Sequence, residues 1–202
     1  MGLISNGTTI FDNGAMASGF GGNLIFISSA TASASANISF TSGIDSTYKE
    51  YVFYFVSIHP ASDGVQFLMQ GSTNGGSSYG VTTTDTNFSA FNRENGTGAG
   101  LGYYSAYDVA QSTSFFPLHS DFLDNDSDSS FSGSLHLYDP SSTTYVKQFM
   151  TRNQSVCSSS PNYTFDSFTA GYFNTTSAIN AIQFKMGSGN IDDGTIYLFG
   201  VN

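Results

Sequence analysis

The stretch that decides the fold is Tyr48–Ile58, which reads YKEYVFYFVSI. Its β-branched and aromatic residues suit a pleated strand, and it is the strongest strand candidate in the chain. Across Tyr51–Val56 every position is apolar, which predicts a strand covered on both faces, at the centre of a sheet. The following His59-Pro60 is expected to end this strand, because proline has no N–H to donate to a strand ladder.

Several segments on either side have the same strand character. Phe131–Tyr138 (FSGSLHLY) alternates, with large apolar residues on one side and serine or histidine on the other. Turn signals such as Asp63-Gly64 separate the segments. Further strands are expected at Leu24–Ser28, Ile38–Phe40, Val65–Gln70, Tyr79–Thr84, Thr144–Met150, Phe165–Phe173, Ala178–Met186 and Thr195–Val201.

About eight to ten short strands at hairpin spacing, with no convincing amphipathic helix, predict an all-β fold. The expected architecture is an antiparallel β-sandwich of the jelly-roll type with an extended N-terminal arm. Between the strands, Arg93–Gly102 is expected to be a glycine-rich loop and Tyr103–Ala110 a short helix or turn. Phe115-Phe116 before Pro117 suggests an edge strand or bulge, and Ser155–Asn162 a polar loop.

The chain is expected to divide into an arm, residues 1–23, and a β-sandwich domain, residues 24–202. Met1–Asn23 is rich in glycine and asparagine and has two short apolar pieces, Leu3-Ile4 and Ile10-Phe11. It is too small to bury itself, so it is either disordered or docks on another subunit. The remaining chain is long enough to bury a core without disulfides or a structural metal.

Composition and charge exclude some partners. The net charge is -10, with only five lysine and arginine residues to neutralise phosphates. Nucleic-acid binding needs a basic stripe that the sequence lacks. An anionic membrane surface is disfavoured for the same reason. An alternative explanation is that the negative charge serves solubility alone and indicates no partner.

No cofactor is expected. Asp124, Asp126 and Asp128 repeat at every second position, as in the first half of a calcium loop. An EF-hand would need glycine and glutamate where Ser129 and Leu135 stand, so calcium is a weak alternative to a solvated acidic turn. The three histidines lie on separate segments without metal-ligand spacing.

The sequence favours a protein without enzymatic activity. Cys157 is the only cysteine and is expected to be a small buried hydrophobe. Glycosidases occur among jelly rolls and need two facing carboxylates. Here most acidic residues sit in turns, and Glu50 alone lies in an apolar strand, so a glycan-processing enzyme is the third and weakest hypothesis.

Two groups of motifs resemble small virion proteins of marine tailed bacteriophages. The first is Gly43–Tyr51 (GIDSTYKEY), followed by His59-Pro60 and Asp63-Gly64. The second is Gly189–Gly200 (GNIDDGTIYLFG), which is similar to the C-terminal signature Gly-x-Ile-x-Leu-Tyr-Gly of phage fibre and head-decoration domains, with Phe199 in place of tyrosine. The opening Leu3–Thr9 (LISNGTT) also resembles the start of such proteins. The resemblance covers most of the chain, implies a virion role and brings no catalytic residues.

The leading hypothesis is therefore a head-decoration or cement protein, made in the host cytoplasm and located on the virion surface. Its expected partners are the major capsid protein or other virion proteins, and it is expected to form a homotrimer. The arm would anchor it, through five apolar residues that bury against the capsid or neighbouring copies. These contact residues are Leu3, Ile4, Ile10, Phe11 and Phe20.

The alternative hypothesis is a tail-fibre or head-fibre adhesin that binds glycans on the host surface. Tyr103, Tyr104 and Tyr107, which follow the glycine-rich stretch, are the candidate glycan contacts. Tyrosine rings supply flat apolar area with a polar tip, which suits stacking on sugars.

Overall fold

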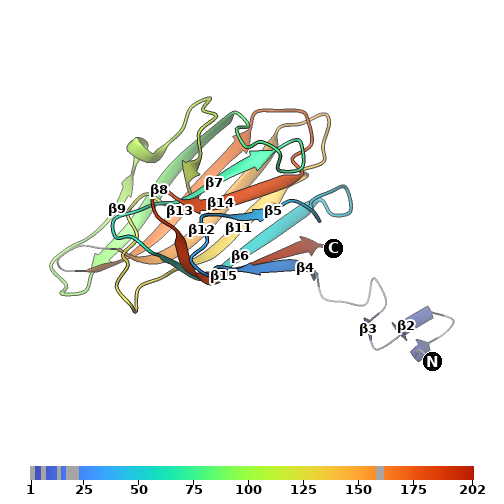
Figure 1. The fold of residues 1–202 in the computed structure, drawn as a ribbon, viewed down its shortest axis with the longest axis horizontal. Coiled ribbons are helices and arrows are strands. Elements are labelled where there is room, and N and C mark those ends of the chain that lie inside the picture. The colour runs from blue at the N-terminus through green and yellow to red at the C-terminus, as the bar shows by residue number, and fades with distance from the viewer. Residues whose placement is uncertain (1–2, 6–7, 13–14, 17–22, 158–161) are drawn as a thin grey trace.

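The structure, a computed structural model, describes residues 3–5, 8–12, 15–16, 23–157 and 162–202. Most of the described chain forms two antiparallel sheets that face each other (Figure 1). A third, small sheet is formed by β1 (Leu3–Ser5), β2 (Thr8–Asp12) and β3 (Ala15–Met16), which pair with one another. These short strands lie within the segment predicted to be an extended arm, and its role as an arm stays a prediction.

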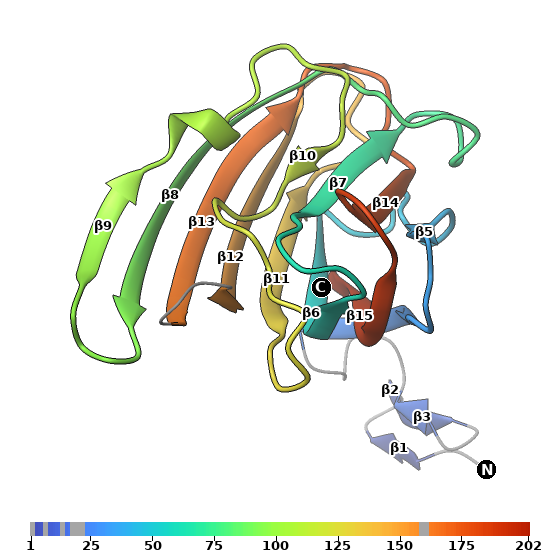
Figure 2. The ribbon, with the colours of Figure 1, turned by 60° about the vertical axis from the view of Figure 1, so that its left-hand side comes forward.

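The larger sheet has eight strands, and every neighbouring pair in it is antiparallel (Figure 2). Its central members carry aromatic or β-branched residues at alternate positions, as half-buried strands do. In spatial order it consists of β4 (Leu24–Thr31), β15 (Ile191–Val201), β6 (Glu50–Pro60), β11 (Phe131–Tyr138), β12 (Lys147–Cys157), β13 (Tyr163–Phe173), β8 (Thr83–Arg93) and β9 (Ala99–Tyr103).

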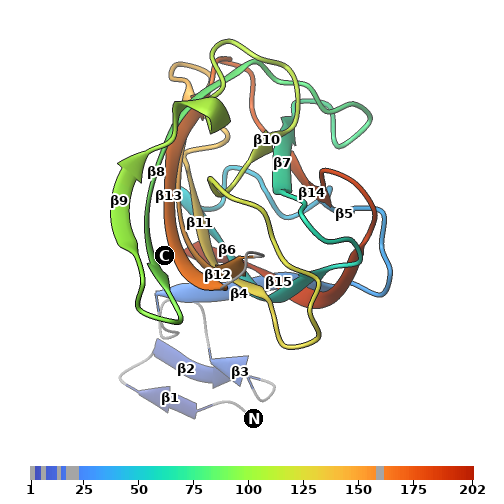
Figure 3. The ribbon, with the colours of Figure 1, turned by 90° about the vertical axis from the view of Figure 1, so that its left-hand side faces the viewer.

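The smaller sheet has four strands and lies on the concave side of the larger one. Figure 3 shows the eight-stranded sheet curving from β9 to β15 around this smaller layer. The order is β10 (Phe116–Pro117), β7 (Phe67–Ser72), β14 (Ala181–Met186) and β5 (Ile38–Phe40). The one helix of the described chain is a single 3₁₀ turn, η1 (Ser105–Tyr107).

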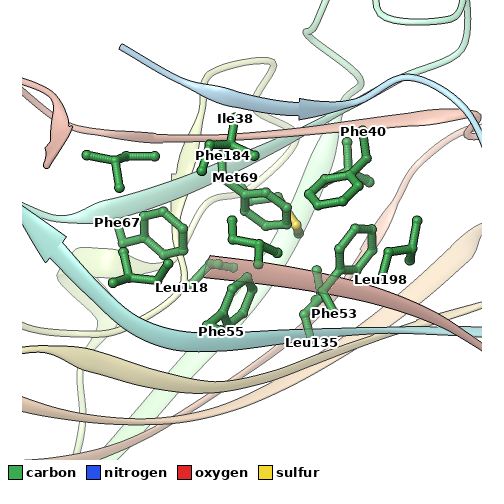
Figure 4. Packing of buried hydrophobic residues seen from close by; sticks show 14 of the residues in the cluster. Ile38, Phe40, Phe53, Phe55, Phe67, Met69, Leu118, Leu135, Phe184 and Leu198 are labelled. Carbon is green, nitrogen blue, oxygen red and sulfur yellow. The ribbon is translucent and has the colours of Figure 1, made fainter. Parts of the chain in front are cut away.

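Phenylalanine is the commonest residue of the core between the two sheets, where it packs with isoleucine and leucine (Figure 4). Phe184 of the small sheet lies at its centre, fully buried. Its ring centroid is 5.4 Å from that of Phe53, 5.2 Å from that of Phe55 and 5.7 Å from that of Phe67. Mostly edge-to-face packing of this kind is favourable for aromatic rings, so this cluster holds the two sheets together.

The concave face of β12, β13 and β8 is polar, and residues 104–123 cover it. Leu118 supplies a carbonyl oxygen that accepts hydrogen bonds from Thr151, Asn153 and Thr169. The backbone of Thr83 exchanges two hydrogen bonds with that of Ser112, at 2.8 and 3.0 Å. Because these buried polar groups have partners in the covering segment, a polar layer is compatible with burial.

The central strand predictions are confirmed, with one correction. β6 lies between β15 and β11, and β11 has the predicted bounds Phe131–Tyr138. However, β6 does not end before His59-Pro60 but continues through Pro60. Proline is tolerated there because it is the last residue of the strand and the pairing with β15 is interrupted by bulges near Ile191 and Asp193.

Parts of two segments predicted as loops belong to strands. Within the glycine-rich Arg93–Gly102, Arg93 ends β8 and Ala99–Gly102 lie in β9, and the two strands pair as a hairpin. Cys157 ends β12 and is fully buried, as a small hydrophobe was expected to be, although it is not in a polar loop. The prediction of eight to ten strands was therefore too low, since the two large sheets alone contain twelve.

Candidate functional site

A pocket of about 210 Å³ opens on the concave side of the larger sheet, at one end of β8 and β13. Strand alternation places Phe91 and Arg93 of β8 on this side, and antiparallel pairing sets Phe91 opposite Phe165 and Arg93 opposite Tyr163. Residues from the covering segment complete the wall. The lining is Phe91, Arg93, Tyr104, Asp121, Tyr163 and Phe165, and we call it the aromatic pocket.

The rings of the aromatic pocket contact one another and fix its shape. Phe165 lies at the base, with ring centroids 6.4 Å from Phe91, 5.9 Å from Tyr104 and 5.9 Å from Tyr163. The neighbouring hairpin strand has Gly100 opposite Phe91. A Cβ atom at Gly100 would lie 2.9 Å from the Phe91 ring, so only glycine at this position leaves enough space for that ring.

Asp121 and Arg93 bring opposite charges to the aromatic pocket. Asp121 Oδ2 accepts a short hydrogen bond from the Tyr163 hydroxyl, and its Oδ1 accepts from the Phe122 N–H at 2.7 Å. Among the described residues, no carboxylate lies within ion-pair distance of the Arg93 guanidinium. The pocket therefore holds an oriented acceptor and a set of donors that no described carboxylate neutralises.

Burial and the nearby carboxylate keep the tyrosines of this region protonated. Burial raises the pKa of Tyr163 first, and the hydrogen bond to Asp121 raises it further. Burial likewise raises the pKa of Tyr104 and of Tyr107, with the charge of Asp121 adding to both. All three hydroxyls are therefore hydrogen-bond donors at neutral pH.

The structure separates the three tyrosines predicted to contact glycans. Tyr104 lines the aromatic pocket, and Tyr107 lies beside it, with ring centroids 6.5 Å apart. Tyr103 is on the opposite face of the sheet, 64% exposed, where its hydroxyl donates a short hydrogen bond to Asp108 Oδ2. Tyr103 is the last residue of β9 and Tyr104 follows it, and the two side chains lie on opposite sides of the sheet, so they do not share one site.

The convex face of the eight-stranded sheet, here called the outer face, is a second candidate surface. Large apolar side chains stay exposed on it, among them Phe26 (56%), Met150 (54%) and Val56 (47%). The complete set of exposed large residues on the strands of this face is Leu24, Phe26, Val56, Phe88, Leu101, Tyr103 and Met150.

Further aromatic residues pack beside these in two groups. Phe88 stacks on Phe168 at 4.8 Å between centroids, and the Arg152 guanidinium lies 5.0 Å above the Phe168 ring. At the other end of the sheet, Phe26 and Tyr54 both pack edge-on against Phe199, at 5.7 Å. The outer face thus has its own aromatic packing, separate from the core.

Charges on the outer face are few and paired. Arg152 donates two hydrogen bonds to Asp166, at 3.2 and 2.9 Å. Glu50 Oε1 lies 2.6 Å from His136 Nδ1. The pair of Arg152 with Asp166 carries no net charge, although the whole chain has a net charge of -10.

The three aspartates proposed for calcium do not converge. Asp124 is buried and uses its Oδ1 to accept the Asp126 N–H at 2.9 Å, whereas Asp126 and Asp128 are exposed. Asp128 lines a cleft of about 450 Å³ that also contains His59 and Asp192. In the described ranges, no three or more histidine, cysteine or acidic side chains are grouped so that they could hold a metal ion.

Two buried titratable groups outside the pocket, His119 and Cys157, are held in neutral form. His119 is fully buried, its Nε2 accepts the Phe67 N–H at 3.0 Å, and burial lowers its pKa to about 3. Burial raises the pKa of Cys157 to about 12, so its thiol is protonated at neutral pH. Neither group has the properties of an activated nucleophile or base.

The structure does not describe the side chains of the five residues predicted as arm contacts. Leu3 and Ile4 are in β1, Ile10 and Phe11 are in β2, and only their backbone pairing is described. Phe20 lies outside the described residues. These five contacts stay predictions.

Comparison of the chain with protein-family models, with curated proteins and with solved structures gave no match. Within the part of the chain that the structure describes, no helix has the length and apolar character needed to cross a bilayer.

Proposed function

We propose that this chain is a non-catalytic structural protein of a virion surface, which associates with further copies of itself through the outer face. The observation that carries the proposal is the outer face, where large apolar side chains stay exposed in the single chain. Contiguous exposed apolar patches are uncommon on monomeric proteins and mark interaction surfaces. The motifs that resemble virion proteins favour the same kind of role.

The outer face has the size that a stable contact requires. Eight strands at a spacing of about 4.8 Å span roughly 35 Å across the sheet, and the longer strands extend about 30 Å. The resulting area is on the order of 1,000 Å², whereas ordinary specific interfaces bury about 800 Å² on each partner. The outer face of one copy can pack on a sheet of another copy as sheets pack face to face within a β-sandwich.

Charge favours a second copy of the chain as the occupant. Two molecules of net charge -10 repel each other unless the surface that joins them is nearly neutral. The outer face comes close to this condition where Arg152 pairs with Asp166 and Glu50 lies beside His136. A strongly basic or acidic partner would find no complementary charge on it.

Sedimentation equilibrium over about 1–100 μM tests this self-association. Wild-type protein should form oligomers, and Phe88→Glu and Met150→Glu should each shift the equilibrium to monomer, because each buries a charge in the contact. Phe122→Glu is the matched control, since Phe122 is 44% exposed but lies in a loop away from the outer face. A monomeric wild type at every concentration, or an equal effect of the control, contradicts the proposal.

On the particle, residues 1–23 are the proposed anchor to the major capsid protein or another virion protein. The trimeric state and the jelly-roll class of the sandwich belong to the same proposal and stay predictions. Immunogold electron microscopy of particles whose genome encodes this chain should label the virion surface. Unlabelled particles that nevertheless contain the intact gene would remove the virion role.

A further inference from the structure

We propose that the aromatic pocket binds one residue of a neutral saccharide, by stacking on its rings and by hydrogen bonds to Asp121 and Arg93. This site does not depend on self-association through the outer face, because it opens on the opposite, concave side of the sheet. The inference gives the chain a ligand-binding activity in addition to its proposed structural role.

The shape of the aromatic pocket fits a flat, partly apolar ring. Its volume of about 210 Å³ is small for a drug-sized ligand and suits a single sugar unit. Phe91, Tyr104 and Tyr163 are only partly buried, so ring surface is left for a ligand to contact. The C–H groups on one side of a pyranose carry slight positive charge, and aromatic faces are negative, which favours stacking.

The polar groups select for hydroxyls. Asp121 keeps acceptor capacity beyond the two hydrogen bonds that it already receives, since a carboxylate has about four lone-pair positions. Arg93 offers several donors without a described carboxylate partner. Adjacent sugar hydroxyls donate and accept at once, so a diol can satisfy both residues. A purely apolar ligand would leave Arg93 and the remaining lone pairs of Asp121 without partners, at a cost in binding affinity.

Electrostatics favour a neutral sugar over an acidic one. The carboxylate of Asp121 lies in the same pocket as Arg93, and the chain as a whole has a net charge of -10. A uronic acid would gain one ion pair but would be repelled by Asp121 and by the surrounding acidic surface. A neutral hexose meets no such repulsion.

The aromatic pocket is preorganised to bind. Tyr163 donates to Asp121 and keeps its proton because its pKa is raised by burial, so it fixes the orientation of the carboxylate. The register of β8 with β13 fixes four of the six lining residues on paired strands. A site on rigid strands loses little freedom when a ligand binds. In this scheme Tyr163 is a positioning residue, whereas Tyr104, Asp121 and Arg93 contact the sugar.

Biolayer interferometry on immobilised dextran, mannan, galactan and alginate tests the inference with the full chain. We expect binding to at least one of the three neutral polymers and weaker or no binding to alginate, a polyuronate. Tyr104→Ala should weaken that binding about tenfold or more, and Arg93→Gln should weaken it while leaving every ring in place. Tyr145→Ala is the control, because Tyr145 is 71% exposed and does not line the aromatic pocket.

The thermal midpoint of each variant separates loss of binding from loss of folding. Loss of binding in Arg93→Gln at an unchanged midpoint supports the site. Absence of binding to all four polymers overturns the inference, and so does binding that Tyr104→Ala and Tyr145→Ala reduce equally. Preference for alginate overturns the neutral-sugar assignment.

Discussion

Replacing Asp85 with asparagine should remove a loss of stability that the protein suffers as the pH rises. Asp85 is 7% exposed on the concave side of β8. Its Oδ1 accepts the Val109 N–H at 2.7 Å, but its Oδ2 is buried without a hydrogen-bond partner among the described residues. Burial raises the pKa of this carboxyl from 3.8 to about 7, and the charge of Asp108 adds to the increase.

The direction of the effect follows from where the proton is bound. Between these two pKa values the folded state keeps a proton that the unfolded state has lost, so stability falls as the pH rises. The contribution of Asp85 is therefore complete below its unfolded pKa and is lost as the pH rises through about 7. Between about pH 5 and 8 this loss is about 2.5 kcal/mol. His119 acts oppositely, since its lowered pKa adds stability that is present above pH 6.5 and lost as the pH falls toward about 3.

Comparison of Asp85→Asn with wild type isolates the Asp85 contribution, because His119 is common to both. Urea unfolding at fixed ionic strength from about pH 5 to 8, followed by circular dichroism, gives the free energy of unfolding of each protein. The difference in favour of the variant should grow by about 2.5 kcal/mol over this range. Asp63→Asn, at an exposed turn, controls for the loss of one negative charge. Parallel profiles for wild type and Asp85→Asn would refute the reasoning.

Three further predictions concern the core, a close strand approach and the N-terminal segment. Phe184→Ala should lower the free energy of unfolding by about 3–5 kcal/mol in urea titrations, because it leaves a cavity among buried rings; a loss below about 1 kcal/mol would contradict the central place given to this ring. Gly171→Ala should cost about 1–3 kcal/mol, since its Cβ would lie 2.5 Å from the Thr84 carbonyl oxygen, whereas Gly187→Ala, whose nearest contact would be 3.7 Å, should cost less. Deleting residues 1–22 should leave the strand-type circular dichroism spectrum intact but abolish co-sedimentation with particles; a truncated protein that still co-sediments would show that the anchor lies elsewhere.

The sequence predicted the fold class and the central strands because those signals are local. β11 has the predicted bounds because alternation and flanking turns are both visible in its eight residues. An edge strand or a bulge was expected at Phe115-Phe116 because of Pro117, and β10 is the outermost strand of the small sheet. In both cases the residues that decide the structure are neighbours in the chain.

The hairpin of β8 and β9 was missed because its cause is tertiary. Glycine weakens strand propensity, so Arg93–Gly102 has the composition of a loop. Gly100 nevertheless lies in a strand, opposite Phe91. Glycine is required there because a Cβ atom would lie 2.9 Å from the Phe91 ring. β12 was predicted too short for a related reason: its serines and asparagine look solvated, but Asn153 is buried and donates to the Leu118 carbonyl 35 residues away.

The candidate site was predicted only at Tyr104. Phe91 and Tyr163 are far apart in the chain, and they meet because β8 and β13 pair in a particular register. No local pattern encodes that register or places Asp121 beside them. Adjacent tyrosines suggested a single site, but β9 ends at Tyr103, and Tyr104 lines the aromatic pocket on the other side of the sheet.

The strongest sequence signal supports the use of the outer face. Tyr51–Val56 is apolar at every position, which predicts a strand covered on both faces. In the single chain Tyr51, Phe53 and Phe55 are buried in the core beneath the second sheet. On the other face Val52 is 1% exposed and Val56 is 47% exposed. The single chain therefore accounts for the pattern except at its last residue, and a second copy packed on the outer face, as proposed, would cover Val56 as well.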